Sequence, residues 1–278
     1  PQAPATPKKE TTMLHLTPAL TAYILCLAAV LGAVCGSFAG CMAARIPAGE
    51  DFLRGRSHCA ACGHTLAPRE LVPVFSWLFL KGKCRYCAAP IPAACPVTEV
   101  LCAAVFAALV WRYDVTILTL EYLVLATLLL AISLVDWDTG LIPDGLLLAG
   151  ILNFALFTVL GGGEILPRLL RGLGGGLALS VPVLLLVLLM DRVLKKESMG
   201  GGDIKLFFLC GLYFSWREVL YLLILSCVLG LALGLLTGKT TGDPDNPKAL
   251  PFGPAICAAT ILALFTAETV LGWYLGLF

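Results

Sequence analysis

Two aspartates lie where apolar stretches meet polar ones, and such a pair could cut a peptide bond. Asp136 stands in SLVDWDTGLIPD, directly after an apolar run, and Asp203 follows three consecutive glycines in ESMGGGDIK. Two carboxylates close together do not both ionise easily, so one keeps a proton while the other acts as a base on water. Peptide hydrolysis needs both functions, because the water loses a proton and the carbonyl or leaving nitrogen gains one.

The residues around Asp203 could shape such a site. Three glycines precede it: Gly200, Gly201 and Gly202. Without side chains they could let an extended substrate approach the acid, or unwind the start of a helix. We expect the charged neighbours Glu197 and Lys205 to tune the acids electrostatically.

Other carboxylates have simpler interpretations. Asp144 follows Pro143, a position typical of a helix N-cap, and Asp203 could cap its own helix in the same way. Asp138 could simply face water. Glu121 stands alone inside an apolar segment, where a pairing role or a place in a cavity is expected.

Four of the twelve cysteines have the spacing of a metal site. Cys59 and Cys62 form one CxxC pair, and Cys84 and Cys87 form a second. Two such pairs can close a tetrahedral zinc site with no open position, which makes the metal structural. Two disulfides are the competing interpretation, although they do not persist in a reducing compartment. His58 and His64 flank the first pair and could substitute as ligands.

The elements that position these residues are membrane helices. The chain of 278 residues is 59% hydrophobic and 13% charged, whereas soluble proteins are roughly half apolar and a quarter charged. An all-α polytopic membrane protein is therefore predicted, with about eight transmembrane helices. The predicted spans are Leu16–Phe38, Val97–Trp111, Val115–Val135, Leu141–Leu160, Leu173–Met190, Ile204–Trp216, Val219–Leu236 and Pro254–Leu277.

The distribution of basic residues predicts the sidedness. With eight spans both termini share one side, and 13 of the 19 Lys and Arg residues fall in loops on the other side. The positive-inside rule makes that other side cytoplasmic. The cysteine loop, Asp136 and Asp203 are then all cytoplasmic, where the two acids can meet. The near-neutral net charge of +1 gives no support for a nucleic-acid partner.

The expected organisation has four parts. Residues 1–15 form an N-terminal tail outside the fold, and residues 16–38 form the first transmembrane helix. Residues 39–96 form the cytoplasmic zinc-binding loop, and residues 97–278 form the transmembrane domain with the two acids.

Several motifs in order resemble the type IV prepilin leader peptidases, membrane aspartic proteases that share a GxGD signature with presenilin-like enzymes. They are GSFAGCMAARIP, the two CxxC pairs, VDWDTGLIPD, ESMGGGDIKL and PFGP at Pro251–Pro254. The resemblance covers nearly the whole chain. It implies that Asp136 and Asp203 are the catalytic residues.

The resemblance also implies a substrate and a second cofactor. Such enzymes remove a short basic leader from prepilin or pseudopilin precursors at the cytoplasmic face of the bacterial inner membrane. Many also methylate the new N-terminus with S-adenosylmethionine. This chain departs from the pattern at Ala94-Cys95-Pro96, where the family commonly has Arg-Tyr-Pro, and at Gly40, where Asn is common. An arginine is suited to bind a carboxylate bidentately, so the departure bears on methyl transfer.

Two other functions fit part of the pattern. A presenilin-like protease of other signal peptides would also carry GGGD, and Ala249-Leu250-Pro251 resembles an element of that group, but the cysteine loop argues against it. An ion-coupled transporter would also place acids within the membrane, although no inverted repeat is evident.

Overall fold

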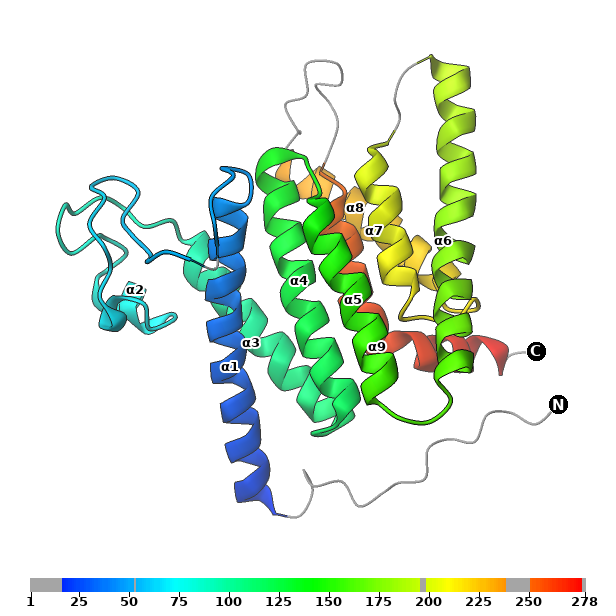
Figure 1. Cartoon of the computed structure of the whole chain (residues 1–278), viewed down its shortest axis with the longest axis horizontal. Coiled ribbons are helices and arrows are strands. Elements are labelled where there is room, and N and C mark those ends of the chain that lie inside the picture. Colours follow the sequence, from blue (N-terminus) through cyan, green and yellow to red (C-terminus); the bar gives the residue numbers. More distant parts are fainter. Residues whose placement is uncertain (1–16, 53, 196–198, 239–250, 277–278) are drawn as a thin grey trace. The chain divides into compact units, whose positions relative to one another are not determined.

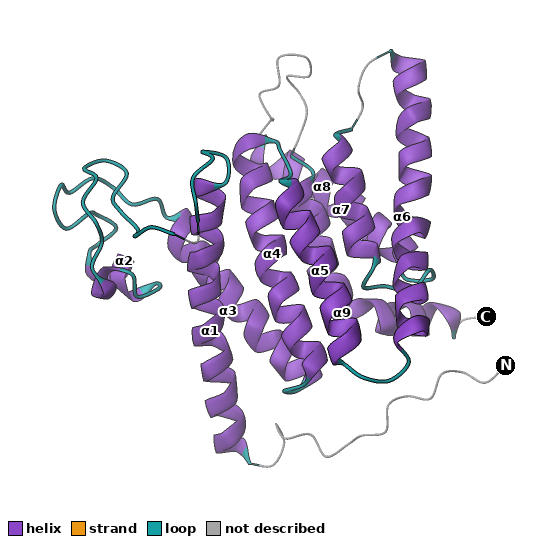
Figure 2. Ribbon diagram, viewed as in Figure 1, coloured by secondary structure: helices purple, strands orange, loops and turns teal. Residues whose placement is uncertain are grey.

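The computed structural model describes residues 17–52, 54–195, 199–238 and 251–276, and these contain helices and loops but no strand (Figures 1 and 2). The all-α prediction is therefore confirmed for this part of the chain. The elements are α1 (Pro18–Arg45), the 3-10 turn η2 (Pro68–Glu70), α2 (Phe75–Phe79), α3 (Ala94–Tyr113), α4 (Ile117–Thr139), α5 (Asp144–Leu160), α6 (Ile165–Leu194), α7 (Gly201–Gly211), α8 (Val219–Thr237) and α9 (Gly253–Leu275).

Six of the described helices are long and apolar enough to cross a membrane: α1, α3, α4, α6, α8 and α9. Two further predicted spans correspond to shorter helices. The helix α5 has 17 residues and α7 has 11, and 11 residues rise only about 16 Å. The chain is a multi-pass membrane protein, and the crossing of α5 and α7 stays a prediction.

The first helix continues beyond its predicted end. The prediction placed a loop after Gly36-Ser37-Phe38, whereas α1 runs on to Arg45. Gly36 serves packing here, because a Cβ atom on it would lie 2.9 Å from the Cα of Glu99 and from the Cβ of Cys102 in α3. The glycine thus lets two helices approach closely without ending either one.

The chain divides into two compact units. The first comprises the residues up to Ser37 together with His58–Leu123, and the second comprises Phe38–Ser57 and the residues from Val124 onward. The first unit holds the cysteine loop and α3. The second holds the last part of α4, with Asp136, and the whole of α7, with Asp203.

Within the second unit the helices pack in pairs, α6 against α7 and α8 against α9. Glycines of α6 make the first pair possible, since a Cβ atom on Gly175 would overlap the carbonyl oxygens of Gly211 and Phe214. A Cβ atom on Gly176 would lie 3.0 Å from Phe208. Gly175 and Gly176 therefore allow α6 and α7 to pack closely.

Candidate active site and metal centre

Asp136 lies in the last turn of α4 and is buried, with 4% of its surface exposed. Its Oδ2 atom accepts a hydrogen bond of 2.9 Å from the backbone N–H of Gly253, the first residue of α9. A helix N-terminus offers unpaired N–H groups and a partial positive charge, and both stabilise the ionised carboxylate. This surrounding favours Asp136 as the charged member of a pair.

Asp203 lies in the first turn of α7, which is too short to cross a membrane alone. The N-cap position belongs to Gly200, whose O atom accepts the N–H of Asp203 at 3.1 Å. The alternative that Asp203 caps its helix is therefore wrong. Its Oδ1 atom is buried and has no hydrogen-bond partner among the described residues, which disfavours the charged form.

The electrostatics of Asp203 link it to Asp136. Burial, and secondly the negative charge of Asp136, raise the pKa of the Asp203 carboxyl from 3.8 to about 7. The structure thus brings the two acids within electrostatic reach across the ends of α4 and α7. A pair with one ionised and one protonated carboxyl is the arrangement that acid–base hydrolysis requires.

The glycines before Asp203 differ in what they do. Gly202 contacts the segment before α5, because a Cβ atom on it would lie 3.1 Å from the Cβ of Ile142. A Cβ atom on Gly201 would meet nothing within 4 Å, so this glycine faces open space. The backbone of Gly200 is extended, and the helix begins at the next residue.

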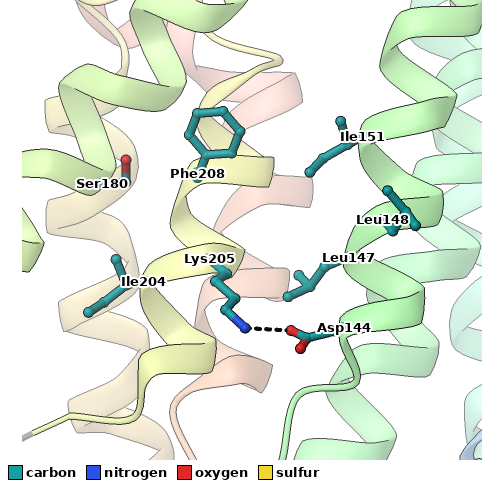
Figure 3. A pocket seen from close by; sticks show the side chains of 8 residues that line it. All are labelled: Asp144, Leu147, Leu148, Ile151, Ser180, Ile204, Lys205 and Phe208. Carbon is teal, nitrogen blue, oxygen red and sulfur yellow. Dashed lines mark hydrogen bonds and ion pairs between the residues drawn. The ribbon is translucent and has the colours of Figure 1, made fainter.

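Lys205 forms an ion pair with an acid of another helix, and its expected influence on Asp136 and Asp203 stays a prediction. Its Nζ atom forms an ion pair of 2.7 Å with Oδ1 of Asp144, and both side chains are exposed (Figure 3). The pair lies beside a largely apolar cavity of about 350 Å³ between α5, α6 and α7. Its lining residues are Asp144, Leu147, Leu148, Ile151, Ser180, Ile204, Lys205 and Phe208. Glu197 lies outside the described residues.

The remaining acids are dispersed. Asp138 is exposed, in agreement with the interpretation that it faces water. Asp144 occupies the first turn of α5, whose N-cap residue is Pro143, so Asp144 is not the cap itself. Glu121 is fully buried within α4.

One contributor to the site was missed in the sequence. Gly253 belongs to the stretch PFGP, which is one of the motifs of the family resemblance but had no role assigned to it. A Cβ atom on Gly253 would lie 2.6 Å from Oδ2 of Asp136. The available signal was a glycine followed by a proline at the start of an apolar segment, where helices often begin.

The four predicted metal ligands form one cluster in the first unit. The sulfur atoms of Cys59, Cys62, Cys84 and Cys87 all lie within 4.8 Å of one another. The Sγ atoms of Cys59 and Cys87 are 3.8 Å apart, and sulfurs bound tetrahedrally to zinc at about 2.3 Å are also about 3.8 Å apart. No cysteine is in a disulfide. The residues present therefore fit a zinc ion.

The two knuckles repeat one backbone pattern. The N–H of Cys59 donates to the O atom of His64, and the N–H of Cys84 donates to that of Ala89, at 2.9 and 2.8 Å. The residue after each second cysteine has a left-handed backbone, with φ of 70° at Gly63 and 58° at Ala88. His64 stacks on Tyr86 instead of joining the cluster.

The thiols influence one another. The backbone N–H groups of Cys62 and Ala61 lower the pKa of Cys59 to about 6. Although the N–H of Ala89 lowers the pKa of Cys87, desolvation and the other thiols together raise it to about 11. Thiols this close do not all ionise unless a cation joins them, which is what a bound metal supplies.

Comparison with known families covers both units. Residues 30–113 match the Bacterial Peptidase A24 N-terminal domain, and residues 123–235 match the Type IV leader peptidase family. The chain belongs to the type IV leader peptidase family. The second match contains both Asp136 and Asp203, and the first contains the four-cysteine cluster.

Curated members of the type IV leader peptidase family are similar over most of their length. A prepilin leader peptidase/N-methyltransferase of Pseudomonas putida is 32% identical over 281 residues, which cover 93% of this chain and 95% of that protein. The protein of the same name from Bacillus subtilis is 30% identical, over 88% of this chain and 96% of that protein. No solved structure matches the chain.

Membership in the type IV leader peptidase family makes the chain an enzyme of the peptidase class. The resemblance seen in the motifs is therefore confirmed. The matches favour neither of the two alternatives, a presenilin-like protease and an ion-coupled transporter.

Proposed function

We propose that the chain is an aspartic endopeptidase that removes the short basic leader from type IV prepilin-like precursors. The single observation that carries the proposal is that two carboxyl groups in electrostatic reach of each other have different surroundings. The Oδ2 atom of Asp136 accepts the backbone N–H of Gly253 at the start of α9, whereas Asp203 has a buried oxygen with no hydrogen-bond partner among the described residues and a raised pKa.

This asymmetry assigns a role to each acid. Asp136, ionised, takes a proton from the attacking water, and Asp203, protonated, donates one to the carbonyl oxygen or the leaving nitrogen. The open space at Gly201 leaves room for an extended chain beside Asp203. Lys205 and Asp144 would border the path, at one end of the apolar cavity.

The substrate follows from the relatives and from the membrane. The similar curated proteins are called prepilin leader peptidases. A precursor with a basic leader and an apolar helix leaves the leader in the cytoplasm, so it must be cut where the helix enters the bilayer. We place both aspartates and the cysteine loop at that cytoplasmic face, as the distribution of basic residues predicts.

We propose structural zinc for the four-cysteine cluster. Its four thiolates would complete the coordination shell and leave no position for a substrate. The loop they belong to has few buried apolar residues, so metal bonds would supply much of its stability.

The relatives' full name includes N-methyltransferase, and one carboxylate in the first unit fits the cofactor that this implies. Glu70 is buried, its Oε2 atom accepts the N–H of Ala67 at 2.8 Å, and its Oε1 atom has no partner among the described residues. S-adenosylmethionine, which would supply the methyl group, carries cationic sulfonium and ammonium groups. We propose Glu70 as the residue that would hold one of these cationic groups.

One assay tests both activities. The purified protein is incubated with a prepilin in detergent, with and without S-adenosylmethionine, and the products are weighed by mass spectrometry. Asp136→Asn and Asp203→Asn should each slow cleavage by a factor of about 100 or more, because each removes an acid–base function. Asp138→Asn, a change at an exposed acid two residues away, is the matched control and should cleave like the parent.

Glu70→Gln should cleave normally and leave the product unmethylated. Parental cleavage by either dyad variant would refute the aspartic mechanism. Methylation by Glu70→Gln at the parental rate would remove Glu70 from the transfer site, and a parent that cleaves without methylating would limit the function to the protease.

A further inference from the structure

An apolar surface on the cysteine loop is left uncovered by the described residues of the first unit. It consists of Leu71, Val72, Phe75, Leu78 and Phe79, which we call the α2 surface. Phe79 is 84% exposed and Phe75 is 61% exposed. Apolar groups of this size rarely gather on a free aqueous surface, and such a gathering marks an interaction site.

The loop is hydrogen-bonded to a membrane helix at this point. The N–H of Val74, directly before α2, donates to Oε2 of Glu99 at 2.6 Å. Glu99 lies in the second turn of α3, about 8 Å along the axis from Ala94, and α3 is long and apolar enough to cross a membrane. The beginning of α2 is therefore held beside the end of a membrane span.

Two further contacts hold α2 near the start of α3. The Nε1 atom of Trp77 donates to the O atom of Ile91 at 3.2 Å, and the N–H of Ile91 donates to the O atom of Gly82 at 2.8 Å. Ile91 is three residues from the start of α3.

The backbone at Val74 is strained in reaching this position. It has φ of 63° and ψ of −53°, with a hydrogen bond from the N–H of Phe75 to the O atom of Pro73. This tight turn is rare, and a β-branched residue adopts it at a cost. The bond to Glu99 offsets part of that cost, so the placement of α2 is specified by the structure.

The charges around the α2 surface select its partner. Between His58 and Ala93 the one acid, Glu70, is buried, while every exposed charged side chain is basic. These side chains are Arg69, Lys81, Lys83 and Arg85. Zinc thiolates would add negative charge at the knuckles without changing the sign of these exposed groups. A basic leader would be repelled, whereas anionic lipid headgroups would be attracted.

We propose that α2 is an interfacial anchor, with Phe75, Leu78 and Phe79 inserted among the lipids at the membrane surface and the neighbouring lysines bound to anionic headgroups. Apolar side chains with basic neighbours are the composition of segments that lie in the membrane interface. The anchor would keep the cysteine loop against the bilayer.

Photochemical crosslinking tests the anchor in the whole protein. The zinc-loaded chain is placed in nanodiscs of phosphatidylcholine with or without phosphatidylglycerol, with p-benzoylphenylalanine at position 79. The matched control carries the same group at Ala60, which is exposed in the first knuckle. We expect lipid adducts at position 79 several-fold above those at position 60, and a higher yield with phosphatidylglycerol.

The variant Lys81→Glu/Lys83→Glu should lose the gain that phosphatidylglycerol gives, at unchanged zinc content per chain. Lipid adducts at position 79 no more frequent than at position 60 would overturn the proposal, as would adducts to another part of the same chain. A yield independent of phosphatidylglycerol would overturn the part played by the lysines. Adducts that move from lipid to an added prepilin would show that the surface binds substrate instead.

Discussion

At the scale of single residues, the two aspartates differ because their surroundings differ. The carboxylate of Asp136 faces a helix N-terminus and receives a backbone N–H. The carboxyl of Asp203 belongs to the first turn of α7 and keeps one buried oxygen with no hydrogen-bond partner among the described residues. The negative charge of Asp136 adds to the effect of burial and raises the pKa of Asp203 further. The same side chain therefore suits two opposite roles.

Gly253 is predicted to be necessary for this arrangement. In Gly253→Ala the new Cβ atom would lie 2.6 Å from Oδ2 of Asp136, so the carboxylate or the start of α9 must move. We expect prepilin cleavage to fall by about a hundredfold, since small displacements of catalytic groups have effects of that order. The rate of cleavage at saturating prepilin measures the loss.

The control for that change is Gly272→Ala, which lies in the same helix with nothing within 4 Å of the new atom. It should cleave like the parent. Equal rates in both variants would show that Gly253 has no part in holding Asp136.

At the scale of elements, α6 positions the short helix that carries Asp203. Because α7 has only 11 residues, it gains little from its own length and depends on its neighbours. The close contact of α6 with Gly211, the last residue of α7, and with Phe214 in the turn after it requires glycine on the α6 side. A stable α6–α7 pair is therefore a condition for a stable site.

A substitution in α6 tests this dependence. Gly175→Ala should overlap two carbonyl oxygens at the end of α7 and lower the free energy of unfolding by about 1–3 kcal/mol, the usual effect of overpacking. Gly174→Ala, whose new atom meets nothing within 4 Å, is the control. Thermal unfolding in detergent compares the two, and equal midpoints would contradict the packing argument.

At the scale of the whole molecule, the number of crossings decides which residues share a side. Six helices are long enough to cross, while α5 and α7 are shorter. If α5 crosses, the loop at Gly161–Gly163 lies on the opposite side of the membrane from the cysteine loop. If it does not, the loop stays on the side of the cysteine loop.

Reporter fusions distinguish these topologies. Alkaline phosphatase, which is active only outside the cytoplasm, should be active when fused after Gly163 and inactive when fused within the cysteine loop at Ala60. Green fluorescent protein should give the reverse pattern. An inactive phosphatase after Gly163 would reduce the number of crossings below eight and place α5 at one surface.

Much of this molecule could be predicted from sequence because the determining features are local. Apolar runs identify all the long helices of the described residues, and the CxxC spacing identifies four cysteines that lie together in space. Helix ends were less predictable. At Gly36 a glycine that usually suggests a turn instead allows contact with α3, and only the neighbouring helix distinguishes these outcomes.

By itself, the sequence determined the helical membrane architecture, the four-cysteine cluster and the two candidate acids, since hydrophobicity and the chemistry of side chains belong to the residues themselves. Only the tertiary structure decided which groups surround each acid. The N–H bonded to Asp136 comes from a residue 117 positions away, and Lys205 pairs with Asp144, 61 positions away. Contacts between distant segments depend on how the helices pack, and that packing is a property of the folded chain alone.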